Sequence, residues 1–335
     1  MARSVGIDLG TANTIICVKG KGIVLREPSV VAIESKSRRL VAAGIAAKQM
    51  TGKTPGEITA FRPIKDGVIA DYRITADMLE YFFHKIGMKS IFNRPNVVVS
   101  IPYGITEVEK RAVEDAALDA GAKSVALIEE PIAAAIGTGL RVAEARGCMI
   151  IDVGGGTCEV AVMSLGGIVV SNFVKIGGDQ LDAAIVSYIK RRHNVMIGDA
   201  TAEMLKKSIG TVHPSVDRGV MEIKGRNLMT GLPAIIKIQS QEIREALAEP
   251  LEKIIECIRT TLETTPPELS GDIFDIGIML TGGSAMLGGF DTLISQITGT
   301  RVMVAKRPLE SVAVGIGRVI ESSNAYKEFI DFRAR

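Results

Sequence analysis

The stretch from Met149 to Met163 reads Met-Ile-Ile-Asp-Val-Gly-Gly-Gly-Thr-Cys-Glu-Val-Ala-Val-Met, which predicts a strand, a tight turn and a second strand. An apolar run ends at Asp152, three glycines and Thr157 follow, and Val160 continues in β-rich character. Consecutive glycines let backbone N–H groups point into one concavity, which suits phosphate oxygens. A carboxylate at the strand end would repel phosphate unless a cation lay between them, so Asp152 predicts Mg²⁺. An ordinary glycine-rich hairpin explains this stretch alone equally well.

A second stretch, from Val5 to Ile16, repeats the same order of an apolar strand, Asp8, an apolar residue, Gly10, a small polar turn and a returning strand. Two such hairpins in one chain predict two related halves that face one nucleotide. Neither hairpin fits a Rossmann fingerprint, because a strand rather than a helix follows the glycines. The nearest P-loop candidate, residues 51–54, also fails, since Ala47 stands where its first glycine is required.

Composition sets the broad class of the chain. At 335 residues the chain is longer than a single hydrophobic core usually supports, and it is long enough for two domains. The formal net charge of +2, from 40 basic and 38 acidic residues, gives no electrostatic footprint for nucleic acid, so we expect no nucleic-acid partner. The sequence contains no apolar run of membrane-span length and opens directly into a strand, which predicts a cytoplasmic protein. Four unpaired cysteines predict reduced core residues.

Alternating strand and helix patterns predict an α/β architecture with helices over a mixed sheet. Thr106 and Glu109 form a capping-box pattern that predicts a helix start. Glu130 precedes Pro131 and falls near another helix start, where the helix dipole alone would favour an acidic residue. A carboxylate at this junction could also orient a water molecule toward a γ-phosphate. Asp179 is predicted as the N-cap of a helix in the second half.

Taken together, the motifs resemble those of the actin-like ATPases, a superfamily that also includes DnaK-type chaperones and sugar kinases, and they are most similar to the bacterial MreB group. Three motifs carry most of the resemblance: residues 8–13 (Asp-Leu-Gly-Thr-Ala-Asn), residues 152–157 (Asp-Val-Gly-Gly-Gly-Thr) and residues 280–285 (Leu-Thr-Gly-Gly-Ser-Ala). They resemble the first phosphate loop, the second phosphate loop and the adenosine loop. Residues 62–71, 129–135 and 175–179 are similar to the group as well.

The resemblance implies an actin-like ATPase fold, with two related halves that each contain a mixed β-sheet flanked by helices, and with the nucleotide in the cleft between them. It places the first half at residues 1–140 with an inserted small subdomain at about 32–66. The second half would span residues 141–308 with an inserted subdomain at about 182–240. Residues 309–335 would form a C-terminal helix that returns to the first half.

ATP or ADP with Mg²⁺ is the cofactor that the resemblance implies. Asp8, Asp152 and Asp179 would hold the metal, and Glu130 with Thr157 would activate the attacking water. The implied nucleotide contacts are Gly10, Thr11, Ala12, Asn13, Gly154, Gly155, Gly156, Thr157, Gly178, Glu203, Lys206, Gly282, Gly283 and Ser284. Among these, Glu203 would meet the ribose and Lys206 would flank the adenine. Ser284 stands where the group usually has a third glycine.

Three functions on this fold are separated by further features. A DnaK-type chaperone needs a substrate-binding region after its ATPase domain, and the sequence ends at Arg335, so we expect no chaperone. A sugar kinase remains the enzyme alternative, although no carboxylate base for a sugar stands out besides Glu130. The resemblance favours a filament-forming cytoskeletal protein, a weak Mg-ATPase coupled to polymerisation, that organises wall synthesis and cell shape. Its partners would be its own copies in polar or antiparallel protofilaments and wall-synthesis membrane proteins.

A membrane contact is implied at Ile91 and Phe92. These two large apolar residues lie in a short segment with Lys89 and Arg94 on either side. From the sequence alone, packing against the domain's own core is the preferred explanation of both residues. The MreB group matches this position to a membrane-inserting loop, which implies a peripheral location at the cytoplasmic face of the membrane.

Overall fold

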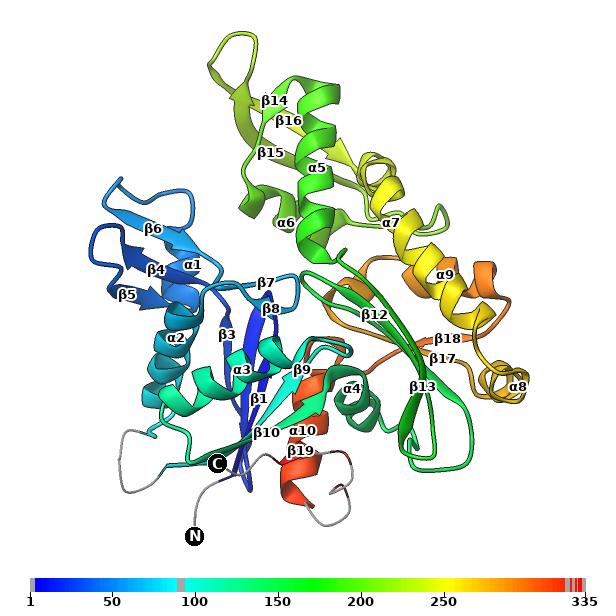
Figure 1. The fold of residues 1–335 in the computed structure, drawn as a ribbon. Coiled ribbons are helices and arrows are strands. Elements are labelled where there is room, and N and C mark those ends of the chain that lie inside the picture. The colour runs from blue at the N-terminus through cyan, green and yellow to red at the C-terminus, as the bar shows by residue number, and fades with distance from the viewer. Residues whose placement is uncertain (1–3, 89–93, 323–325, 327–328, 330, 333–335) are drawn as a thin grey trace. The chain divides into compact units, whose positions relative to one another are not determined.

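The computed structural model describes residues 4–88, 94–322, 326, 329, 331 and 332. The chain forms two compact units (Figure 1). Unit 1 comprises Met1–Arg146, Met163–Ile168 and Leu309–Arg335, and unit 2 comprises Gly147–Val162 and Val169–Pro308. The predicted halves and inserted subdomains remain predictions.

Unit 1 is built on a six-stranded mixed sheet in the order β19-β10-β9-β1-β2-β3. Its strands are β1 (Ser4–Leu9), β2 (Asn13–Val18), β3 (Gly22–Pro28), β9 (Asn96–Ile101), β10 (Ser124–Glu129) and β19 (Asp331–Phe332). A smaller sheet and a two-stranded pair add β4 (Val31–Glu34), β5 (Leu40–Ala43), β6 (Ile58–Phe61), β7 (Ile64–Lys65) and β8 (Val68–Ile69). The helices are α1 (Ile45–Met50), α2 (Tyr72–Lys85), α3 (Glu107–Asp119), α4 (Glu130–Thr138) and α10 (Ser311–Glu321), the last preceded by the 3₁₀ helix η2 (Pro308–Glu310).

Helices cover both faces of this sheet at strand β1. Val5, Ile7 and Leu9 belong to a core cluster with residues of α2 and α3. Gly6, which points to the other face, lies against α10: a Cβ added there would be 2.4 Å from Ile316 Cγ2. Successive side chains on a strand alternate between faces. Asp8 therefore lies on the face of β1 that α10 covers.

Helix α10 also packs against α4 with almost no space between the backbones. A Cβ added at Gly137 of α4 would lie 1.8 Å from the Ser311 oxygen, and one added at Gly315 of α10 would lie 1.7 Å from the Ala133 oxygen. Arg318 donates a hydrogen bond to the Ile136 oxygen. Glycine at both positions is what lets these helices approach. The position of α4, and of Glu130 at its start, is thus set by α10.

Unit 2 contains a five-stranded sheet in the order β13-β12-β11-β17-β18 and a three-stranded antiparallel sheet in the order β14-β15-β16. The strands are β11 (Cys148–Val153), β12 (Cys158–Ser164), β13 (Gly167–Val174), β14 (Val195–Met196), β15 (Val220–Asn227), β16 (Pro233–Gln239), β17 (Ile278–Thr281) and β18 (Val302–Val304). The helices are α5 (Gly178–His193), α6 (Asp199–Ile209), α7 (Ser240–Glu263), α8 (Pro267–Ile276), the 3₁₀ helix η1 (Gly283–Met286) and α9 (Phe290–Thr298).

A single large core joins these helices to the five-stranded sheet. It includes Ile151 of β11, Val160 of β12, Leu181 of α5, Leu205 of α6 and Leu280 of β17. The β11 and β12 residues that flank the three glycines are therefore anchored in apolar packing.

Two predictions from composition can be compared with the structure. All four cysteines are buried and free, as predicted for core residues. Among the described residues, no helix combines the length and apolar character needed to cross a membrane.

The close packing of α4 on α10 predicts a large difference between two glycine-to-alanine substitutions. Gly137→Ala should lower the melting temperature, because overpacking of this kind costs about 1–3 kcal/mol. The matched control is Gly271→Ala in α8, where an added Cβ meets nothing within 4 Å. That change should raise stability by roughly 0.5–1 kcal/mol, since alanine is the better helix former. Thermal unfolding followed by circular dichroism measures both, and equal melting of Gly137→Ala and the parent would contradict the packing argument.

Candidate functional site

The glycine turn of unit 2 connects β11 to β12, as the sequence predicts. The Gly154 N–H donates to the Thr157 oxygen at 2.9 Å and closes the turn. Asp152, two residues earlier, pairs with Thr281 of β17 across the sheet. The next residue on that side, Gly282, has φ +85°, and a Cβ there would lie 2.4 Å from both Asp152 Oδ1 and the Val153 oxygen. Only glycine fits at this point, so the end of β17 packs directly against the strand that carries Asp152.

The first residues of α5 support the same turn from another side. The Gly178 N–H donates to the Gly154 oxygen at 3.0 Å, and the Asp179 N–H donates to the Gly155 oxygen at 2.8 Å. A Cβ on Gly177 would lie 2.7 Å from the carbonyl carbon and oxygen of Gly155.

The predicted N-cap of α5 is wrong by two residues. Gly177 is the N-cap, and Asp179 lies in the first turn of the helix. The close approach to the Gly155 carbonyl explains why a residue without a side chain occupies the cap position. The Gly177 N–H is satisfied by Gln180 Oε1 at 2.8 Å.

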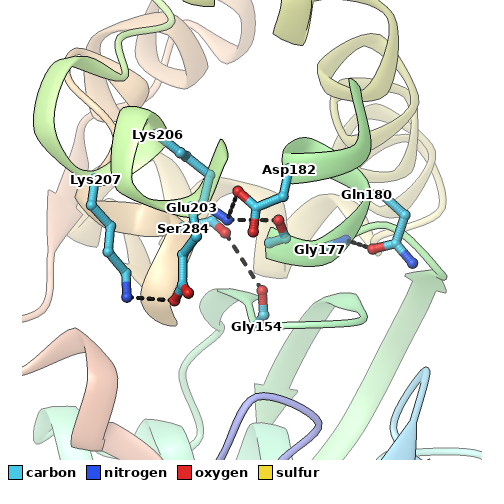
Figure 2. A network of polar contacts seen from close by, with 9 residues as sticks. Gly154, Gly177, Gln180, Asp182, Glu203, Lys206, Lys207 and Ser284 are labelled. Carbon is cyan, nitrogen blue, oxygen red and sulfur yellow. Dashed lines mark hydrogen bonds and ion pairs between the residues drawn. The ribbon is translucent and has the colours of Figure 1, made fainter. Parts of the chain in front are cut away.

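Helix α6 brings charged side chains to this region (Figure 2). Lys206 Nζ donates to the Gly178 oxygen at 2.6 Å and pairs with Asp182 of α5 at 2.9 Å. Glu203 pairs with Lys207 at 2.6 Å. The Ser284 hydroxyl lies 3.5 Å from the Gly154 oxygen. Unit 2 therefore brings together residues from four separate segments of the sequence: Gly154, Gly178, the α6 residues Glu203 and Lys206, and Ser284.

The turn of unit 1, between β1 and β2, closes in the same way. The Gly10 N–H donates to the Asn13 oxygen at 3.1 Å, as the Gly154 N–H does to the Thr157 oxygen. The two sequence repeats thus have the same backbone turn, each two residues after an aspartate.

A serine supports this first turn in place of a helix start. Ser29 Oγ donates to the Gly10 oxygen at 2.6 Å, and the Ser29 N–H donates to the Ala12 oxygen at 3.0 Å. Thr11 Oγ1 accepts a hydrogen bond from the Gly67 N–H at 2.9 Å. The turn is therefore held by two other segments of unit 1, the residue after β3 and the loop between β7 and β8.

Glu130 is the first residue of α4, directly after β10, and Glu129 is the N-cap. Burial raises the pKa of the Glu129 carboxyl, and Lys110 partly offsets this. Within unit 1, Glu130 and Asp8 belong to two elements, α4 and β1, that both pack on α10.

Sequence reasoning missed several residues that shape the two turns. Gly177 and Gln180 at the start of α5, Asp182 beside Lys206, and Ser29 in unit 1 all make direct contacts described above. The double glycine before Asp179 was a signal for Gly177, but nothing in the sequence pairs Asp182 with Lys206. The predicted membrane residues Ile91 and Phe92 lie outside the described residues.

Two carboxylates of unit 2 have unusual proton affinities. Asp152 keeps part of its surface exposed, but desolvation of its carboxylate raises its pKa to about 7. Desolvation also raises the pKa of Asp182 to about 6, although Lys206 acts in the opposite direction. Isolated charge is expensive to desolvate, so an aspartate in the position of Asp152 favours either a proton or a nearby cation.

The fold and the two repeated turns define an actin-like α/β protein. The chain is similar over nearly its whole length to proteins of one family. The family model described as MreB/Mbl protein matches residues 2–328. The chain belongs to this family.

Individual relatives agree with that assignment. The chain is 50% identical to the cell shape-determining protein MreB of Escherichia coli strain K12 over 325 residues, covering 96% of this chain and 94% of the relative. It is 48% identical to the cell shape-determining protein Mbl of Bacillus cereus over 321 residues, covering 96% of each. The crystal structure of MreB5 of Spiroplasma citri bound to AMPPNP has a TM-score of 0.92 at 38% identity and covers 98% of both chains.

The raised pKa of Asp152 predicts a pH-dependent effect of Asp152→Asn. Between its ordinary 3.8 and about 7, the folded protein binds more protons at this carboxyl than the unfolded chain, so stability falls as pH rises through that window and stays lowered above it. Asparagine removes this cost. The variant should therefore gain stability over the parent at pH 8, on the order of a few kcal/mol at most, and gain almost none at pH 4.

Thermal unfolding at the two pH values, in a chelator and without nucleotide, measures this difference. The parent measured beside the variant cancels the titration of every other group, including Asp182. A gain that is the same at pH 4 and pH 8 would show that Asp152 is not ionised at a cost in the folded protein.

Proposed function

We propose that this chain is an ATP-dependent, filament-forming cytoskeletal protein that contributes to cell shape. The observation that carries the proposal is a pair of turns, Gly10 to Asn13 and Gly154 to Thr157, that are closed by the same backbone hydrogen bond. Each turn follows an aspartate. Membership of the MreB/Mbl family supports it, as do the names of the relatives, which are cell shape-determining proteins. The related MreB5 of Spiroplasma citri has crystal structures bound to AMPPNP and to ADP, which supports an adenine nucleotide as the ligand.

Each turn presents backbone N–H groups to the phosphates in this proposal, because glycine-rich turns expose such groups without side-chain obstruction. Unit 1 contributes residues 10–13 and unit 2 contributes residues 154–157. Gly178, Glu203 and Lys206 come from α5 and α6. Gly282, Gly283 and Ser284 follow β17 and complete the adenosine side.

The carboxylates present fit Mg²⁺. The desolvated carboxylate of Asp152 gains from a cation, and Asp8 occupies the matching place in the unit 1 hairpin. The described residues hold no cluster of three or more histidine, cysteine, aspartate or glutamate side chains suited to a metal. Mg²⁺ does not need such a cluster, because it keeps several waters and is commonly bound by one or two carboxylates together with phosphates. Bound there, it would offset phosphate charge, and Asp179 would help to hold it.

Water activation is assigned to Glu130 and Thr157. Glu130 at the start of α4 would accept a proton from the attacking water, and Thr157 would help to orient that water. Hydrolysis would be slow and coupled to polymerisation, so that nucleotide state controls subunit contacts. Polar or antiparallel protofilaments of this chain are the proposed assembly.

Assembly in the presence of ATP and Mg²⁺ is the direct test of this function. Light scattering should rise when both are added and should fail to rise with a chelator. A hexose screen in the same buffer tests the kinase alternative: sugar phosphorylation without assembly would replace the cytoskeletal proposal with a small-molecule kinase.

The proposed location is the cytoplasmic face of the membrane, beside wall-synthesis membrane proteins, with Ile91 and Phe92 as the contact. Burying one such side chain contributes about 1.5–3 kcal/mol, so a single subunit would bind weakly. A filament presents the contact many times and gains avidity. Anionic liposomes added to the assembly reaction should pellet with assembled protein and leave unassembled protein in solution.

Binding and hydrolysis should separate in two sets of variants. Asp152→Ala should weaken ATP binding itself, because it removes a carboxylate beside the proposed cation. Glu130→Ala and Thr157→Ala should keep nucleotide but slow phosphate release by ~10²–10⁴-fold, because positioning the attacking water for proton transfer typically contributes that much. Fluorescent-nucleotide titration and a phosphate-release assay measure the two steps. Parental hydrolysis by Glu130→Ala would remove that residue from the mechanism.

A further inference from the structure

Lys206 and Asp182 form a buried ion pair between α6 and α5. Their relative exposures are only 9% and 8%, and the Nζ to Oδ1 distance is 2.9 Å. Buried charges are costly unless they are paired and hydrogen-bonded. Lys206 meets both conditions: its ammonium group is paired with Asp182, and it donates a hydrogen bond to the Gly178 oxygen at 2.6 Å.

The second contact links the pair to the glycine turn. Gly178 accepts from Lys206 through its oxygen and donates through its N–H to the Gly154 oxygen at 3.0 Å. One peptide step further, the Asp179 N–H donates to the Gly155 oxygen at 2.8 Å. A continuous polar path therefore runs from Asp182 through Lys206 and Gly178 to the turn. Figure 2 shows its first step, the pairing of Lys206 with Asp182.

The space around Lys206 is also closed. A Cβ added at Gly178 would lie 3.1 Å from Lys206 Nζ and 3.7 Å from the Ser284 hydroxyl. Ser284, 5% exposed, lies 3.5 Å from the Gly154 oxygen. The ammonium group is thus enclosed between α5, α6 and the residues after β17, close to the turn that unit 2 contributes to phosphate binding.

We propose that Asp182 and Lys206 are positioning residues that fix the Gly154–Thr157 turn through Gly178, so that the pair controls affinity for the phosphates rather than selection of the base. This inference rests on the proposed function, because it concerns the same nucleotide. It assigns a role to Asp182 and gives the ammonium group of Lys206 a partner within the protein. Removing the Lys206 charge leaves Asp182 buried without its partner and frees the Gly178 carbonyl. Removing the Asp182 charge leaves the Lys206 ammonium group buried without its partner and takes away the group that holds it against Gly178. Either change loosens the start of α5 against the turn.

Two single variants test the proposal, Asp182→Asn and Lys206→Met. Each should weaken binding of ATP, ADP and GTP alike by roughly tenfold or more, the effect expected from losing a hydrogen bond to a charged group. The ratio of ATP affinity to GTP affinity should stay at the parental value. Competition against a fluorescent ATP analogue, with Mg²⁺ present, measures all three affinities. A base contact by Lys206 would instead change the ratio.

A double variant guards against loss of folding. Asp182→Leu combined with Lys206→Met replaces the pair by apolar groups, a change that buried ion pairs often tolerate. This double variant should fold, and its affinity for nucleotide should be as low as that of the single variants, because the hydrogen bond from Lys206 to Gly178 is absent.

The matched control lies at the other end of the same helix. His193 Nε2 and Glu242 Oε1 are 2.5 Å apart and join the last turn of α5 to α7. Glu242→Gln should lower the melting temperature while nucleotide affinity stays parental, since this contact does not touch the turn.

The outcomes separate the two proposals. If the unmodified protein binds no ATP, the proposed function fails and this inference fails with it. If it binds ATP and Asp182→Asn binds with parental affinity, the inference alone is overturned. A changed ATP-to-GTP ratio in Lys206→Met, with a parental Asp182→Asn, also overturns it and makes Lys206 a base contact.

Discussion

The backbone packing of the Gly154–Thr157 turn is the constraint on which the candidate site of unit 2 depends. The turn is enclosed by the start of α5, where a Cβ on Gly177 would lie 2.7 Å from the Gly155 carbonyl. Gly282, which follows β17, packs just as tightly beside the turn, because a Cβ there would lie 2.4 Å from the Val153 oxygen. Separations of this size exclude any side chain. The shape of the turn is therefore determined by main-chain contacts, and polar side chains can adjust its position but do not create it.

The two repeated turns are closed by the same backbone hydrogen bond, but different groups support them from outside. In unit 1 the Gly10 oxygen accepts from the Ser29 hydroxyl, whereas in unit 2 the Gly154 oxygen accepts from the first backbone N–H of α5. Helix starts carry partial positive charge, which favours nearby anions. The unit 2 turn thus gains an electrostatic contribution from α5 that the unit 1 turn lacks, although both keep the same hydrogen bond across the turn.

Sequence reasoning succeeded where short-range pattern determines structure. Both strand–turn–strand repeats are present, and the capping box of Thr106 and Glu109 forms as predicted. It failed at the start of α5, because aspartate is the better N-cap by residue type, while the tertiary contact with Gly155 requires glycine there. The pairing of Asp182 with Lys206 joins residues on two helices that only the folded core of unit 2 brings together. No local pattern contains that information.

The distribution of charge in unit 2 supports the proposal that nucleotide and Mg²⁺ bind together. Lys206 is a buried cation beside the start of α5, and it pairs with Asp182 and the Gly178 oxygen. Asp152 receives no compensating charge from it, and desolvation raises the Asp152 pKa to about 7. A phosphate group arriving alone would add a second negative charge beside that carboxylate. A divalent cation arriving with the phosphates would reverse the sign of the interaction, and because Lys206 is paired internally, this is the reason we propose that Mg²⁺ accompanies the nucleotide.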